Sequence, residues 1–141
     1  MSFLKKLFNH THTYKEDINM TNKDKALALI NTFATGDTDA AKNLLAEGYI
    51  QHNTGIADGL SGLGAALEAL GKQGIQMIYD QTYQVLADGN YGLAVSEGSF
   101  GGAHTSYYDL FRVENGKIVE HWDVMETIAD KSTWQNQNGK F

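Results

Sequence analysis

Residues 109–123 read DLFRVENGKIVEHWD, and they carry the strongest structural signal in this sequence. Apolar and polar residues alternate on both sides of Asn115-Gly116, the dipeptide most typical of a tight β-hairpin turn. We therefore expect two antiparallel strands, at residues 104–113 and 117–126. Their register matters, because a slip of one residue moves every side chain to the opposite face of the sheet.

The loop at Asn115-Gly116 allows two registers. A two-residue loop pairs Glu114 with Lys117, and it places Tyr108, Leu110 and Arg112 beside Val119, His121 and Asp123. A three-residue loop makes Gly116 the left-handed residue of a bulge and pairs Val113 with Lys117. We favour the three-residue loop, because it gathers polar side chains on one largely apolar face. That register sets Asp109 opposite His121, Tyr107 opposite Asp123 and Phe111 opposite Val119. The reverse face, suited to a dimer interface, then holds Tyr108, Leu110, Arg112, Ile118, Glu120, Trp122 and Val124.

In the segments before this hairpin, apolar residues recur either with the two-residue period of a strand or with the spacing of a helix. Turn signals at 88–90 and 101–102 delimit two further strands, at 75–87 and 91–100. Upstream of them, apolar residues recur at helical spacing in three segments, from about 23 to 35, 37 to 47 and 60 to 70. Gly36 and Gly48 are expected to end the first two helices, and a short strand at 49–52 follows. Helices followed by hairpin-linked strands predict an α+β domain with a bent antiparallel sheet.

The length and composition predict one domain that neither binds nucleic acid nor spans a membrane. A chain of 141 residues suits a single core. We expect a domain at 20–128, a polar tail at 129–141 and a dispensable extension at 1–19, which could instead be an amphipathic docking arm. A net charge of −6 argues against nucleic-acid binding. No apolar run is long enough to span a membrane, and the absence of cysteine fits a cytoplasmic protein.

Three sequence motifs carry a resemblance to a known family. They are YIQHN at 49–53, Asp58-Gly59, and the stretch 109–123. Together, over residues 20–128, they resemble the SnoaL-like polyketide cyclases of the nuclear transport factor 2-like superfamily. The resemblance implies a cone-shaped, cystatin-like fold, in which N-terminal helices pack on a strongly curved antiparallel sheet that encloses a pocket. It also implies a homodimer formed through the sheet and a small organic ligand.

The resemblance also assigns roles to two aspartates. Asp109 matches the position at which ketosteroid isomerase keeps a protonated aspartate as a donor to the oxyanion. Asp123 matches the proposed acid/base of the polyketide cyclases. The sequence departs from the family pattern after Asn53, where Thr54 replaces proline. A second departure places Val95 and Glu97 where many relatives carry two histidines.

Proton abstraction next to a carbonyl needs a base near the carbon and a donor facing the developing oxyanion. We expect Asp123 or His121 to be the base, and Asp109, assisted by Tyr107, to be the donor. An enzyme without a cofactor, acting as a cyclase, isomerase or dehydratase, is one interpretation. A non-catalytic module that binds a small ligand or dimerises is the other, and in it the Asp109–His121 pair only fixes the register.

The remaining candidates surround this group. We expect the pocket to be lined by His52, Asn53, Tyr107, Phe111 and Glu97. His52 could instead hydrogen-bond the loop backbone, and Asp58-Gly59 is expected to be a turn and helix cap. For the aromatic residues Trp122, Phe111, Tyr49 and Tyr79, a packing role is favoured over a ligand platform. No metal is expected, because only His121 and Asp123 have local ligand spacing.

Overall fold

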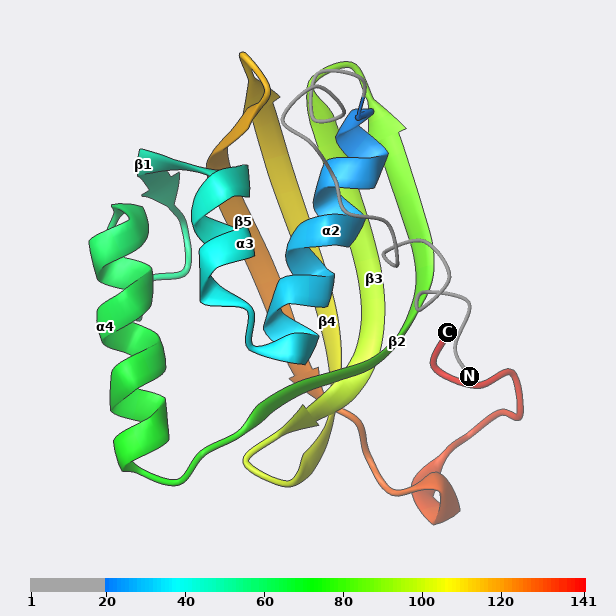
Figure 1. Ribbon diagram of the computed structural model, residues 1–141. Helices are drawn as coiled ribbons and strands as arrows, with labels where there is room; N and C mark the ends of the chain where they lie inside the picture. Colours follow the sequence, from blue (N-terminus) through cyan, green and yellow to red (C-terminus); the bar gives the residue numbers. More distant parts are fainter. Residues whose placement is uncertain (1–19) are drawn as a thin grey trace.

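The structure, a computed structural model, describes residues 20–141, and in it a layer of helices lies against one face of a curved sheet (Figure 1). The element order is α2 (Asn22–Thr35), α3 (Thr38–Leu44), β1 (Leu45–Gln51), α4 (Gly59–Lys72), β2 (Met77–Asp88), β3 (Tyr91–Phe100), β4 (Ala103–Glu114) and β5 (Lys117–Thr127). This is the α+β architecture expected from the sequence. The expectations for residues 1–19 lie outside the described residues.

The first two helices are delimited by capping groups. The side chain of Thr21 accepts from the backbone N–H of Asp24 in a capping box, and Gly36 ends α2 in the left-handed conformation. Asp37 caps α3, which ends at Leu44. The sequence prediction of a helix to Glu47, stopped by Gly48, is therefore wrong, because the chain turns extended at Leu45. Leu45 and Tyr49 are buried there, so core packing favours a strand.

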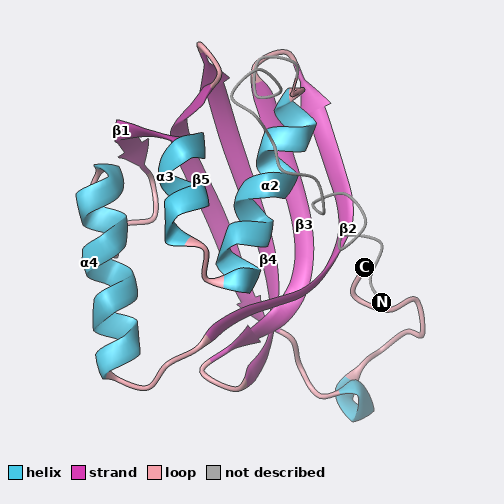
Figure 2. Cartoon of the chain, viewed as in Figure 1, coloured by secondary structure: helices cyan, strands magenta, loops and turns pink. Residues whose placement is uncertain are grey.

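The five strands follow the order β1-β5-β4-β3-β2 (Figure 2). Pairing is antiparallel from β2 to β5, but β1 joins the edge of β5 in parallel. The sheet is thus mixed and not fully antiparallel, and it does not close. α2 packs on β2 and β3, while α4 packs on β1, so the helices cover one face. We call this covered side the inner face and the opposite side the outer face.

The β4–β5 hairpin combines a tight turn with a bulge. Glu114 pairs with Lys117, and Asn115 and Gly116 have φ values of 47° and 77°, as a two-residue type I′ turn requires. The favoured three-residue loop is therefore wrong. The pairing slips further along, since Val113 faces Ile118 whereas Arg112 faces Glu120, which leaves Val119 as an extra residue in β5. Ile118 consequently points into the core and not to the reverse face.

The edge strand β2 bends around α2 through two irregularities in its pairing with β3. Gly98 permits this close approach, because a Cβ at that position would lie 1.8 Å from the carbonyl oxygen of Ile78. Tyr79, opposite Gly98, is turned into the core.

Among residues 20–141, no helix is long and apolar enough to cross a membrane.

The segment after β5 returns toward the sheet. It forms a short 3₁₀ helix, η2 (Lys131–Thr133), and the ring of Phe141 stacks on Tyr83 of β2. Lys140 makes an ion pair with Glu126. These contacts place residues of the expected tail against the strands.

Candidate functional site

The bulge at Val119 brings three ionisable side chains together on the inner face. After the slip, Asp109 lies directly opposite Asp123, and Phe111 lies opposite His121. Asp109, His121 and Asp123 each offer one oxygen or nitrogen atom within 4.8 Å of the others. The three candidates therefore share a face as expected, but through pairings that differ from those of the favoured register.

Asp109 is the centre of this group. Its side chain is 2% exposed, and its two carboxyl oxygens have separate partners. Oδ1 lies 2.9 Å from Nε2 of His121, and Oδ2 accepts a hydrogen bond of 3.0 Å from the phenol of Tyr79. Burying a carboxyl group is costly unless hydrogen bonds replace its water. Here both oxygens receive such partners.

Two stacked tyrosines form the apolar boundary of the group. The rings of Tyr79 and Tyr107 lie 4.2 Å apart, and the Tyr107 hydroxyl donates to the carbonyl of Ser99 at 2.6 Å. Burial, and then the nearby charge of Asp109, raise the pKa of Tyr79 well above its ordinary value. The same two causes raise the pKa of Tyr107 to about 12. Both phenols therefore remain hydrogen-bond donors throughout the neutral range.

The last residue of β1 and the loop after it contact two of the three ionisable groups. Oε1 of Gln51 lies 3.1 Å from Nδ1 of His121, and Nδ2 of Asn53 donates to Oδ2 of Asp123 at 2.9 Å. The carboxylate of Asp58 accepts from the backbone N–H of Gln51 at 2.8 Å. Asp58 does occupy the N-cap position of α4, but its side chain makes no capping hydrogen bond there. Instead it fixes the end of β1.

The structure does not bring His52 or Glu97 to the inner face. His52 stacks on Trp122 and contacts Glu120, which also receives a hydrogen bond from Arg112. Glu97 accepts from Tyr83 and contacts His104. The reason is the two-residue period of a strand, which turns alternate side chains outward. Among the expected pocket residues, Asn53, Tyr107 and Phe111 do lie with Asp109, and Phe111 stacks on His121.

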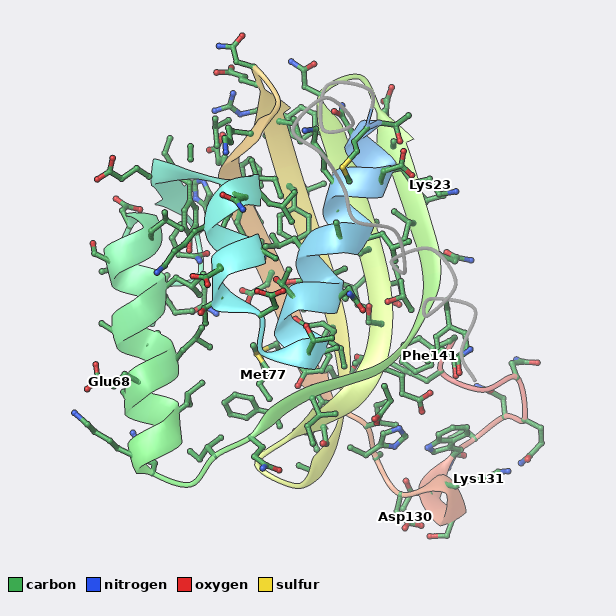
Figure 3. All side chains as sticks on the ribbon, in the orientation of Figure 1. Lys23, Glu68, Met77, Asp130, Lys131 and Phe141 are labelled. Carbon is green, nitrogen blue, oxygen red and sulfur yellow. The ribbon has the colours of Figure 1, made fainter. Side chains whose placement is uncertain are left out.

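A cavity of about 220 Å³ lies between α4 and the ends of α2 and α3. Its wall is largely apolar and includes Leu60, Leu63, Leu67, Leu70, Ile75 and Met77. Figure 3 shows Met77 at the lower end of α2. Asp109, His121 and Asp123 do not line this cavity. Leu60, Leu63 and Met77 line the cavity and also pack against the buried core that contains Tyr79 and Tyr107, so the cavity adjoins that core.

The ionisable group has the donor types of a metal site. Two carboxylates and an imidazole suit a divalent transition metal. In the structure, however, both nitrogens of His121 and both carboxyl oxygens of Asp109 already face protein partners. A metal would have to displace those contacts, so the arrangement fits a hydrogen-bonded acid/base cluster better.

Sequence reasoning missed two members of the cluster, Gln51 and Tyr79. Gln51 could have been found by strand alternation, since it lies two residues from the buried Tyr49 and therefore on the same face. The sequence predicts only a packing role for Tyr79, and its hydroxyl contact with Asp109 arises where β2 bends. No local pattern in the sequence indicates that bend.

Comparison with known families identifies most of the chain. Residues 26–121 match the model of the SnoaL-like domain. A comparison with curated protein sequences found no significant match.

Solved structures share the fold at low sequence identity. An NTF2-like protein from Cytophaga hutchinsonii is 19% identical with a TM-score of 0.65, and the match covers 77% of this chain and 92% of that one. A protein with a cystatin-like fold from Xanthomonas campestris is 24% identical with a TM-score of 0.65, covering 80% and 94%. A candidate polyketide cyclase from Sinorhizobium meliloti is 16% identical with a TM-score of 0.62, covering 77% and 98%. At these identities the likeness establishes the fold alone.

Proposed function

Because this chain belongs to the SnoaL-like domain family, we propose that it binds a small organic carbonyl compound and moves a proton next to the carbonyl without a cofactor. The observation that carries this proposal is the convergence of Asp109, His121 and Asp123 within 4.8 Å on the inner face. A fold of this size does not need two carboxyl groups and an imidazole in contact, since buried ionisable groups seldom add net stability. Such clusters are typical of sites that transfer protons.

Asp123 is the member of the cluster best suited to be the base. It is only half-buried, whereas Asp109 and His121 are buried with all their polar side-chain atoms engaged. In the proposed step, Asp123 takes the proton from the carbon beside the carbonyl. The electron pair of the broken C–H bond forms the enolate. For the enolate oxygen to receive a hydrogen bond, the proton between Asp109 and His121 must turn from that contact toward the substrate.

The apolar lining of the cavity favours an uncharged ligand over a charged one. Its leucine-rich wall offers dispersion contacts and few polar partners. A ligand held there would contact Leu60, Leu63 and Met77, which also pack against the core. Asp123 does not line this cavity, so the proposal requires side chains to change rotamer for a carbonyl to reach it, a motion that is common when ligands bind.

Hydrogen–deuterium exchange on a panel of apolar ketones, followed by NMR, tests this proposal. We expect the protein to accelerate exchange at the carbon beside the carbonyl, and Asp123→Asn to reduce that acceleration by about 10²-fold or more. Asp109→Asn should also reduce it. The exposed Asp88 at the end of β2 provides the control, since Asp88→Asn should exchange at the wild-type rate. Equal rates for all four proteins would contradict the catalytic proposal.

A non-catalytic binding module is the second candidate. It is favoured by one observation, that the cavity wall excludes the three ionisable residues. In that case ketones would bind, with chemical-shift changes around Leu63 and Met77, but their exchange would stay at the rate in buffer. The same NMR samples distinguish the two functions.

A further inference from the structure

The side chain of Gln51 has a fixed orientation between the loop backbone and His121. Its Oε1 accepts a hydrogen bond of 3.0 Å from the backbone N–H of Asn53. Its Nε2 lies 3.1 Å from the phenol oxygen of Tyr49. A backbone N–H only donates, so the atom that faces it must be the amide oxygen. The network therefore determines which end of the amide points at the imidazole.

This orientation determines the proton on His121. The amide oxygen of Gln51 only accepts, so Nδ1 of His121, at 3.1 Å, must carry a hydrogen. The opposite nitrogen, Nε2, lies 2.9 Å from Oδ1 of Asp109. One proton is then held between Nε2 and Oδ1, whichever atom it is bonded to. Both ring nitrogens are engaged, and neither has a lone pair directed toward the cavity.

Asn53, two residues after Gln51, presents its amide nitrogen and not its amide oxygen to the cluster. Its Oδ1 accepts from the backbone N–H of Gly55 at 3.0 Å, which fixes this amide as well. Its Nδ2 therefore donates to Oδ2 of Asp123 at 2.9 Å. The last residue of β1 thus presents an acceptor to His121, and the loop presents a donor to Asp123. This polarity suits an Asp123 that is a carboxylate ready to receive a proton.

We propose that Gln51 is a positioning residue that holds a hydrogen on Nδ1 of His121. The other proton of the pair is then kept between Nε2 of His121 and Oδ1 of Asp109. His121 is then also a positioning residue and not the base, and Asp123 receives the substrate proton. The catalytic consequence rests on the proposed function. The tautomer itself is a property of the resting protein and can be measured without any substrate.

Long-range ¹H–¹⁵N correlation NMR of the histidine rings tests the proposal at pH 7. In the wild-type protein, the Nδ1 resonance of His121 should have the shift of a protonated nitrogen. Gln51→Met, which keeps the side-chain length but removes the acceptor, should move that resonance toward the shift of an unprotonated nitrogen. Gln51→Glu restores an acceptor and should return it. Gln84→Met, on the exposed side of β2, serves as the control and should leave the spectrum unchanged.

Each outcome has a defined meaning. An unprotonated Nδ1 in the wild-type protein overturns the proposal, even if Gln51→Met does not fold. An Nδ1 resonance that is the same in folded Gln51→Met also overturns it. In the ketone exchange assay, Gln51→Met should lose about tenfold or more of the acceleration, and Gln51→Glu should recover most of it. Absence of exchange in the wild-type protein would reject the proposed function but leave the tautomer assignment standing.

Discussion

At the scale of single residues, Tyr79 connects the core to the ionisable cluster. Its ring packs on Tyr107, and its hydroxyl supplies a donor to the buried Asp109. We expect Tyr79→Phe to lower the free energy of unfolding by about 1–3 kcal/mol, because it removes a donor from a carboxyl group that water cannot reach. Denaturant titration of the two proteins measures this difference.

Tyr83 provides the matched control for that variant. Its hydroxyl also donates to a carboxylate, that of Glu97, but the residue is 43% exposed. Water can replace the lost contact there, so Tyr83→Phe should unfold at nearly the same denaturant concentration as the wild-type protein. If both variants lose the same amount, burial of the Asp109 contact has no special importance.

The two buried tyrosines also predict a loss of stability at high pH. A tyrosine in the unfolded chain has a pKa of about 10. Folding raises the pKa of Tyr107 to about 12 and that of Tyr79 well above its ordinary value. Above pH 10 the unfolded chain releases protons that the folded chain retains. Stability present below pH 10 is therefore lost as the pH rises toward 12.

Chemical denaturation at pH 8, 10 and 11 measures this loss. Each buried tyrosine contributes a slope of up to about 1.4 kcal/mol per pH unit, so Tyr107→Phe should make the decline less steep. A decline of equal steepness in Tyr107→Phe would contradict the burial-based explanation.

At the scale of elements, the close contact between β2 and β3 holds Tyr79 in place. A Cβ at Gly98 would meet the backbone oxygen of Ile78 at 1.8 Å, and backbone cannot move aside as a flexible side chain can. We expect Gly98→Ala to lower the free energy of unfolding by about 3 kcal/mol or more. In α4, a Cβ at Gly64 would meet nothing within 4 Å, so Gly64→Ala should raise stability by up to about 1 kcal/mol.

Thermal unfolding of the two alanine variants checks this contrast. Opposite shifts of Tm are expected, downward for Gly98→Ala and upward for Gly64→Ala. A neutral result for Gly98→Ala would mean that β2 can separate from β3 at little cost. The bend of β2 would then not be what positions Tyr79.

The hairpin shows how far local sequence signals extend. Asn115-Gly116 correctly predicted a tight turn, and the alternation on either side correctly predicted two strands. The extra residue at Val119 has no local signature, because valine fits a regular strand equally well. What favours the bulge is tertiary: it lets Ile118 and His121 both face inward. Sequence reasoning therefore grouped Asp109, His121 and Asp123 correctly but derived the wrong pairings.

The end of β1 shows a different limit. Histidine chemistry favours His52 as a candidate, although its neighbour Gln51 is the residue on the inner face. The two-residue period of a strand separates them, because Tyr49 is buried and Gln51 lies two residues further along the same face. The parallel pairing of β1 with β5 was not predictable in this way, since it depends on the path of the chain across α4.

At the scale of the whole molecule, the outer face of the sheet is the surface best suited to a second copy of the chain. Large apolar side chains are exposed there, with Val124 66% and Tyr108 37% accessible, and these two lie opposite each other on neighbouring strands. Tyr91 and Ile50 extend the patch along the same face. We propose that the chain forms a homodimer through this patch, since exposed apolar patches commonly mark interfaces.

Sedimentation velocity tests the dimer directly. The wild-type protein should sediment as a dimer at micromolar concentration, and Val124→Glu should shift it to the monomer, because a carboxylate buried at an apolar interface has no partner. Ala65→Glu adds the same charge to the exposed side of α4 and should leave the dimer intact. His52, Trp122 and Glu120 lie on the same outer face. The resonances of His52 should therefore shift with dilution, whereas those of His121 should not. A monomeric wild-type protein, or a Val124→Glu variant that remains dimeric, would exclude this face as the interface.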